Sequence, residues 1–289
     1  MNFFRILFLP ITAPISFIQN HFKATILVIL LFALYQNSTT NPIIQPNLMR
    51  INLSGAIINA DDILEQINKA KTNSNIKGIL LVVDSPGGAV APSVEIAYAI
   101  KELNKIKPII AYASGTMASG SYYASIWANQ ILANPGSMIG SIGVIMQSID
   151  ASKLLSKIGI KTQTIKMGTY KEAGTPTRAW NSKEKEELQK VIKSTYNMFV
   201  NDVANARKLK LKDYKQYADA HIFTAIQAKN VGLIDQISTI SYAKQLTAKK
   251  ANVKNPRWNK KDKMEKFMDK IIQGTISEIG LNMDRLSAY

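Results

Sequence analysis

The sequence of 289 residues contains no cysteine and only two histidines, His21 and His221. Without cysteine the chain has no thiol nucleophile, no disulfide framework and no cysteine zinc site, and two histidines do not make a histidine-rich metal cage. A nucleophile must therefore be a serine, a threonine, a lysine or a carboxylate. A general base must be His221, a carboxylate or a lysine that burial keeps neutral. We expect no metal and no cofactor.

Acidic residues are also scarce, with 20 Asp and Glu against 36 Lys and Arg, which gives a net charge of +16. Apolar residues still make up 46% of the chain, which excludes wholesale disorder and allows a sizeable core. Nine basic and three acidic residues lie between Lys249 and Lys270. This stretch is interpreted as a solvated tail or helix face, or as a contact for anionic lipid headgroups. Nucleic-acid binding is disfavoured because no reader motif is present.

Charge is absent from the apolar run Ala24–Tyr35, which follows Arg5, His21 and Lys23. The run is shorter than the roughly 20 residues that span a bilayer comfortably. We expect a signal-anchor helix from about Phe22 to Gln36, with a cleaved signal peptide or a buried or interfacial helix as alternatives. Positive charge before the run favours a cytoplasmic N-terminus. In a bacterium this predicts a single-pass protein of the inner membrane, with its domain on the periplasmic or outer side.

The chain divides into four predicted segments, because an Asn-, Thr- and Pro-rich stretch precedes the regular patterning and a basic stretch follows it. These are an N-terminal cytoplasmic and membrane-anchor segment (1–36), a linker (37–48), a folded domain (49–246) and a basic C-terminal extension (247–289).

Strands and helices alternate within the predicted domain. Ile79–Val83 is a continuous apolar run, typical of a strand buried in a parallel sheet. Ser93–Lys105 has helical spacing of its apolar residues, and Ile109–Ala113 is the next strand. A long helix is expected after Asn181, with Glu184 placed for a capping box. This alternation predicts an α/β domain.

Two glycine-rich turns follow apolar strands. The backbone N–H groups of Ser85–Val90 could bind a developing oxyanion, although such a turn is often only a turn. In Gly115–Tyr123, small residues around Ser119 would let a substrate backbone reach its hydroxyl; alternatively, Ser119 caps a helix. Of the candidate bases, His221 has apolar flanks typical of a core or edge histidine. Lys171 has small or aromatic neighbours, a modest reason to prefer it.

Five motifs occur in order along the chain: Ser85–Gly88, Met117–Tyr123, Gly140–Ile145, Gly168–Lys171 and Gln227–Asp235. Together they resemble the signal peptide peptidase A family of bacteria, in its short single-domain form. The resemblance covers roughly Met49–Ser241, about two-thirds of the chain. It implies an α/β fold of the ClpP/crotonase type, with repeated ββα units and a parallel sheet, assembled into rings or domes.

The same resemblance implies a serine–lysine dyad. Ser119 matches the family nucleophile and Lys171 its general base. Gly88 and Gly120 match the positions whose amides form the oxyanion hole, and Ser141 matches a serine that orients the lysine. The implied function is a membrane-anchored serine endopeptidase that degrades cleaved signal peptides and other membrane-associated peptides. Its expected partners are peptide substrates, membrane lipid and further copies of itself, with no nucleic acid.

The chain departs from the family pattern at Ser121, where relatives often have glycine, and at Ala220–Ile222, where they usually have a Gly-Arg pair. Other functions stay open. A catalytically weak membrane scaffold would use the same oligomeric fold. An acyl-CoA enzyme of the crotonase type is disfavoured by the exported location, and a Ser-His-Asp triad by the lack of a histidine between Ser119 and His221.

Overall fold

The computed structural model describes residues 21–38 and 45–259. The chain forms two units, Met1–Gln45 and Pro46–Tyr289. In the first unit, α2 (Phe22–Ser38) is a helix of 17 residues over the predicted anchor segment. Among the residues that the structure describes, no helix is both long enough and apolar enough to cross a bilayer.

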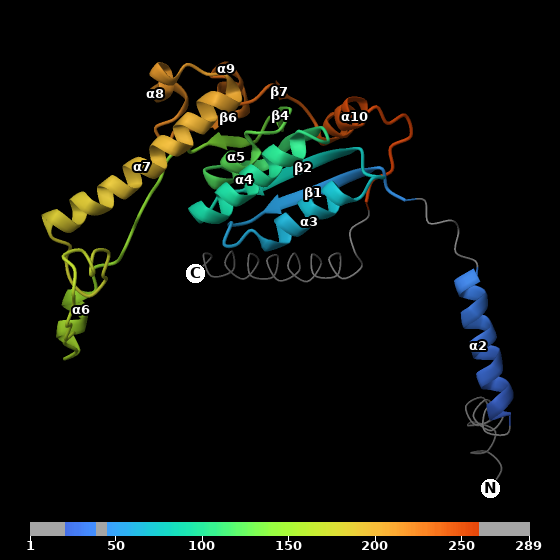
Figure 1. Cartoon of the computed structure of the whole chain (residues 1–289), viewed down its shortest axis with the longest axis horizontal. Coiled ribbons are helices and arrows are strands. Elements are labelled where there is room, and N and C mark those ends of the chain that lie inside the picture. The colour runs from blue at the N-terminus through green and yellow to red at the C-terminus, as the bar shows by residue number, and fades with distance from the viewer. Residues whose placement is uncertain (1–20, 39–44, 260–289) are drawn as a thin grey trace, which may run out of the picture. The chain divides into compact units, whose positions relative to one another are not determined.

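The second unit is built on a sheet of seven strands, which confirms the predicted α/β class with a parallel sheet (Figure 1). Five strands lie parallel in the order β1-β2-β3-β4-β7; β5 pairs parallel with β3 and antiparallel with β6. The strands are β1 (Leu48–Ser54), β2 (Gly78–Ser85), β3 (Ile109–Ala118), β4 (Gln130–Ala133), β5 (Met138–Gly140), β6 (Ile222–Thr224) and β7 (Gln236–Ile237). The helices are α3 (Asp61–Thr72), α4 (Val90–Asn104), α5 (Gly120–Ser125), α6 (Ser152–Lys157), α7 (Ser182–Arg207), η1 (Leu211–Asp213), α8 (Tyr214–Tyr217), α9 (Ala225–Asn230) and α10 (Ile240–Lys250).

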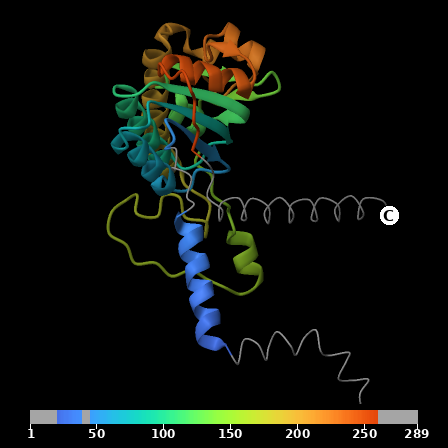
Figure 2. The same ribbon diagram turned by 90° about the vertical axis from the view of Figure 1, so that its right-hand side faces the viewer.

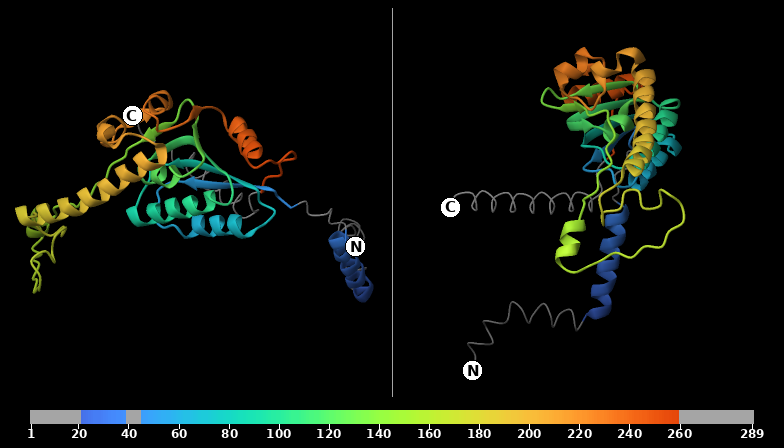
Figure 3. Two further views of the ribbon diagram at one scale, coloured as in Figure 1. Left: turned by 45° about the horizontal axis from the view of Figure 1, so that its top comes forward. Right: turned by 90° about the vertical axis from the view of Figure 1, so that its left-hand side faces the viewer.

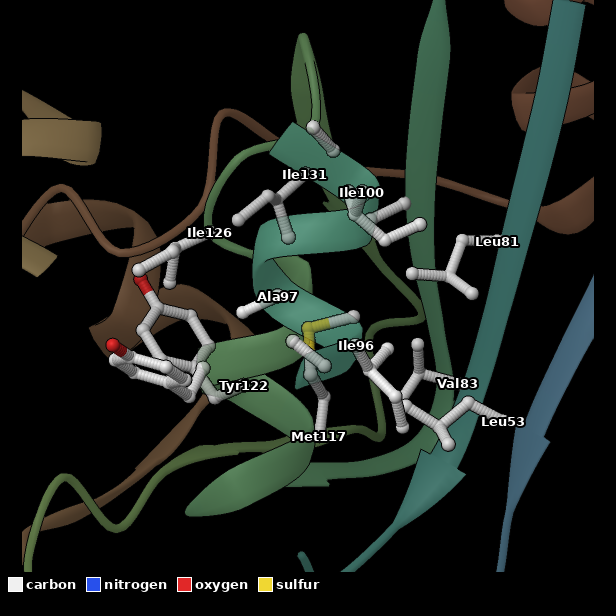
Figure 4. Packing of buried hydrophobic residues seen from close by; sticks show 14 of the residues in the cluster. Leu53, Leu81, Val83, Ile96, Ala97, Ile100, Met117, Tyr122, Ile126 and Ile131 are labelled. Atoms are coloured by element: carbon white, nitrogen blue, oxygen red, sulfur yellow. The ribbon is translucent and has the colours of Figure 1, made fainter. Parts of the chain in front are cut away.

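Strand β2 contributes side chains to both faces of the sheet, and helices cover both faces. Its apolar residues alternate between two cores, with Leu81 and Val83 in the larger one and Leu80 and Val82 in the smaller one. The larger core packs the sheet against α3, α4, α5 and α7, and Figure 4 shows Leu81, Val83 and Met117 there beside residues of α4. The smaller core packs the other face against α10. A strand buried on both faces needs a continuous apolar run, as predicted.

The packed structure continues beyond the predicted domain end at residue 246. That position lies inside α10, whose buried residues include Thr247 and Ala248. Beyond the helix, Trp258 pairs with Leu48 at the edge of the sheet, and the Asn259 N–H donates to the Leu48 carbonyl at 3.2 Å. The stretch is rich in lysine, but α10 still buries one small face in the domain. The change to a basic composition therefore begins before the packed structure ends.

Residues 145–191, which we call the arm, project from the sheet (Figures 1 to 3). The arm joins the segment after β5 to the first half of α7 and contains α6. Of its residues, all of which the structure describes, only Glu184 is buried. Helix α7 begins with the predicted capping box between Asn181 and Glu184. The second half of α7 returns to the domain, where Phe199 and Val203 enter the core.

Candidate active site

Ser119 lies between β3 and α5 in a strained backbone conformation. Its φ is 51° and its ψ is −124°, a region that residues other than glycine rarely adopt. Two backbone hydrogen bonds hold it there: the Ser119 N–H donates to the Gly140 carbonyl at 2.8 Å, and the Tyr123 N–H donates to the Ser119 carbonyl at 3.0 Å. The Ser119 hydroxyl makes no capping hydrogen bond to α5. The alternative of a serine that only caps a helix is therefore wrong, and the hydroxyl is left for other chemistry.

The two glycine-rich turns meet beside Ser119. A Cβ atom added to Gly87 would lie 2.6 Å from the Gly120 nitrogen and 2.9 Å from the Ser119 Cβ. A Cβ atom on Gly120 would lie 3.3 Å from the Gly88 nitrogen and 2.2 Å from the Ser93 Oγ. Side chains at these positions would therefore hold the turns apart.

This contact brings the backbone amides of Gly88 and Gly120 close together beside the serine. In the part of the chain that the structure describes, neither N–H group donates a hydrogen bond to a protein atom. Two unpaired amides next to a serine hydroxyl are the groups that stabilise an oxyanion in acyl transfer. The arrangement therefore has the parts that the sequence predicts for an oxyanion hole.

Ser121, which departs from the family pattern, links the two turns. Its side chain is fully buried. The hydroxyl donates to the Ser85 carbonyl at 2.6 Å and accepts from the Ala118 N–H at 2.9 Å. The bonds tie the start of one turn to the end of β3, just before Ser119. The serine that stands here in place of glycine is evident from the sequence, but only the contacts show what its hydroxyl does.

Replacing Ser121 by alanine should lower the free energy of unfolding by about 1–3 kcal/mol, because it leaves the buried Ser85 carbonyl and Ala118 N–H short of a partner. Urea denaturation of both proteins measures the difference. Ser156→Ala, on the arm, is the control and should change stability by less than about 0.5 kcal/mol. A Ser121→Ala protein as stable as the wild type would show that these hydrogen bonds do not hold the turns.

Ser141 follows β5 directly and also has a positive φ, of 50°. Its N–H donates to the His221 carbonyl at 2.7 Å, and the Ala220 N–H donates to the Ile142 carbonyl at 2.9 Å. Since Gly140 accepts the hydrogen bond from Ser119, Ser141 is one residue from a direct contact of the candidate nucleophile. His221 contributes its backbone here, while its exposed ring lies 5.9 Å from the Phe223 ring.

Lys171 is exposed and lies in the arm, where its N–H donates to the Gly168 carbonyl at 3.3 Å. Within residues 45–259, no hydrogen bond joins its side chain to Ser119 or Ser141. A single chain thus brings Ser119 together with Gly88 and Gly120, and Ser141 lies next to this group. Lys171, the candidate base, makes no hydrogen bond to it within the described residues. The assignment of Lys171 stays a prediction.

A small pocket opens beside Ser119. Among the described residues no charged side chain lines it; its apolar lining residues are Val90, Val94, Tyr123, Val144, Met198 and Phe199. The wall formed by α7 was not predicted from the sequence, which indicated only a long helix after Asn181.

Tyr123 holds this wall in place. Its hydroxyl donates to the Asp202 carboxylate, and its ring packs edge-on against Phe199 with centroids 4.8 Å apart. Burial, with the nearby Asp202 carboxylate, raises the pKa of Tyr123 above its usual value. The phenol therefore stays protonated and continues to donate to Asp202, which fixes α7 against α5.

Comparison with known proteins identifies the family. A sequence profile of peptidase family S49 matches residues 101–254, just over half of the chain and including Ser119, Ser141 and Lys171. The chain belongs to peptidase family S49. The predicted resemblance to signal peptide peptidase A is thereby confirmed.

Relatives outside and inside bacteria share the S49 region. A protein of Methanocaldococcus jannaschii named as a putative protease is 42% identical over 195 residues, which cover 68% of this chain and 62% of that protein. A protein of Enterococcus faecium named as a putative signal peptide peptidase is 38% identical over 183 residues, covering 62% and 52%. The chloroplast serine protease SPPA of Arabidopsis thaliana is 32% identical over 204 residues, covering 70% and 30%. The match thus spans only part of these relatives' length.

Proposed function

We propose that this S49 member is a serine endopeptidase in which Ser119 is the nucleophile, Lys171 the general base, and the amides of Gly88 and Gly120 the oxyanion hole. The observation that carries the proposal is the strained Ser119 beside two unpaired backbone amides. Backbone strain of this kind is enriched at active sites, where the surrounding structure holds it in place. Family membership supports the same assignment.

The reaction would proceed through an acyl-enzyme. Neutral Lys171 takes the proton of Ser119 as the serine oxygen bonds to the peptide carbonyl carbon, and the two amides stabilise the negative oxygen. Collapse of this intermediate breaks the C–N bond, and Lys171 returns the proton to the departing amine. Water then attacks the ester with the lysine again as base, which releases the acid and frees Ser119. Ser141 would orient the lysine by a hydrogen bond.

We propose that Lys171 reaches Ser119 from a neighbouring copy in a ring or dome. The arm supports this, because its side chains include large apolar groups in contact with solvent: Ile149 is 78% exposed, Met167 is 92% exposed and Ile165 is fully exposed. Such groups commonly mark a protein interface. A second copy would cover them and could place one arm beside the next Ser119, which a single chain does not do.

The substrates would be extended peptides with an apolar side chain at the cleaved bond. The backbone of such a peptide can pair as an added strand, while the pocket beside Ser119 accepts the side chain without offering it a charge. Cleaved signal peptides and other membrane-derived fragments have this character. We propose that the segment 1–36 anchors the domain at the periplasmic or outer side of a bacterial inner membrane, in contact with lipid.

Peptides that differ only in the residue before the cleaved bond test this function. The full chain should cleave a leucine peptide with kcat/KM at least about 10-fold above that of its aspartate counterpart, because the apolar pocket cannot compensate a buried charge. Ser119→Ala protein prepared in parallel controls for contaminating proteases. Equal rates for both peptides would contradict the pocket assignment. No cleavage and no acylation of Ser119 would favour the scaffold alternative.

A further inference from the structure

A group of ionic side chains lies in the arm at the start of α7. The Arg178 guanidinium donates to both oxygens of Glu184, at 2.6 and 2.9 Å, and to the Glu172 carboxylate at 3.2 Å. Lys166 donates to the same oxygen of Glu172. Arg178 therefore joins two carboxylates that lie six residues away from it in either direction. In a segment with little regular structure, this bridge links side chains on both sides of Arg178.

One end of the bridge is fixed to α7. Glu184 is only 1% exposed, and it also accepts from the Asn181 N–H at 3.0 Å as part of the capping box. The hydrogen bond from Arg178, followed by that from Asn181, lowers the pKa of Glu184 to about 2. The carboxylate is thus charged throughout the pH range in which a lysine base works, and its stabilising effect is lost only as the pH falls from about 4.5 toward 2.

The other end of the bridge is one residue from Lys171. Glu172 follows Lys171 directly, and hydrogen bonds from Lys166 and Arg178 lower its pKa as well. The backbone around it forms successive turns: the Lys171 N–H donates to Gly168, and the Thr175 N–H donates to the Glu172 carbonyl at 3.0 Å. Fixing the Glu172 carboxylate therefore restrains the backbone that carries the lysine.

We propose that Arg178 is a positioning residue for Lys171, which it fixes to the start of α7 through Glu172 and Glu184. This inference rests on the proposed function, since it gives Lys171 the role of base. Because the far half of α7 is anchored in the core, the bridge gives Lys171 a defined position relative to the folded domain of its own chain, from which it can reach the Ser119 of the next copy. A planar guanidinium suits this task, since its fork can bind both carboxylates at once, which an ammonium group does not do in the same geometry.

Steady-state peptide hydrolysis by full-chain variants tests the proposal. Arg178→Met should lower kcat by about 10–100-fold with little change in KM, because the lysine is displaced while the substrate pocket is intact. Arg178→Lys should restore part of the loss. In a Lys171→Met background, Arg178→Met should cause no further loss, because its effect acts through the lysine. Lys190→Met is the control on the same helix, since Lys190 forms an exposed ion pair with Glu187, and it should leave kcat unchanged.

Size-exclusion chromatography of each variant separates the possible outcomes. Loss of kcat with unchanged assembly and the expected non-additivity supports the positioning role. Loss of kcat together with loss of assembly overturns it and assigns Arg178 to the interface. An unchanged kcat in Arg178→Met, beside an inactive Lys171→Met, also overturns it but leaves the proposed function intact. Wild-type activity in Lys171→Met itself would instead refute the base assignment on which the inference rests.

Discussion

Ser119→Ala should lower peptide hydrolysis by about 10³-fold or more, because the acyl-enzyme can no longer form on Ser119. The pocket and both amides would remain, so substrate binding should change little. Initial rates with a fluorogenic peptide measure the loss of hydrolysis. Direct binding of a labelled peptide measures the second effect.

The stability of Ser119 variants provides the control. Since the backbone at Ser119 has a φ of 51°, Ser119→Gly should raise the free energy of unfolding by about 1 kcal/mol, while it removes activity as fully as alanine does. A more stable and inactive variant would show that the strain serves the reaction. Retention of most activity in Ser119→Ala, with contaminating proteases excluded, would contradict the nucleophile assignment.

Lys171→Met should have an effect of similar size, because methionine keeps the length of the side chain but takes no proton. In the wild type, activity should rise toward alkaline pH, since only a neutral lysine can act as base, and this rise should be absent from the residual activity of Lys171→Met. Initial rates over a series of buffers, with folding checked by circular dichroism at each pH, measure both. Activity that falls above neutral pH in the folded wild type would contradict a lysine base.

Mixing two inactive proteins tests whether Lys171 serves a neighbouring copy. Ser119→Ala and Lys171→Met chains, denatured together and refolded in equal amounts, should recover about a quarter of the wild-type activity if each site takes its serine and its lysine from different chains. Each variant refolded alone should stay inactive. A mixture as inactive as its components, but correctly assembled, would indicate that both residues come from one chain.

Local patterns predicted most of the fold and the glycine-rich turn that carries Ser119. The apolar run of β2, the capping box of α7 and the glycine turns each depend on neighbours in sequence, so each could be read from short segments. The contacts between segments that are far apart in the sequence could not be predicted in this way. The pocket wall on α7 forms because Phe199 packs against Tyr123. The link made by Ser121 forms because the turns after the neighbouring strands β2 and β3 lie in contact. The role of Lys171 is harder still, since one chain leaves it exposed.

The most direct test of the account is covalent labelling of the full chain with a fluorophosphonate, followed by mass spectrometry of its peptides. We expect a single adduct on Ser119 that forms faster as the pH rises, that forms far more slowly in Lys171→Met, and that is lost in Ser119→Ala. An adduct on another serine, or equal labelling rates in the wild type and Lys171→Met, would contradict the serine–lysine mechanism.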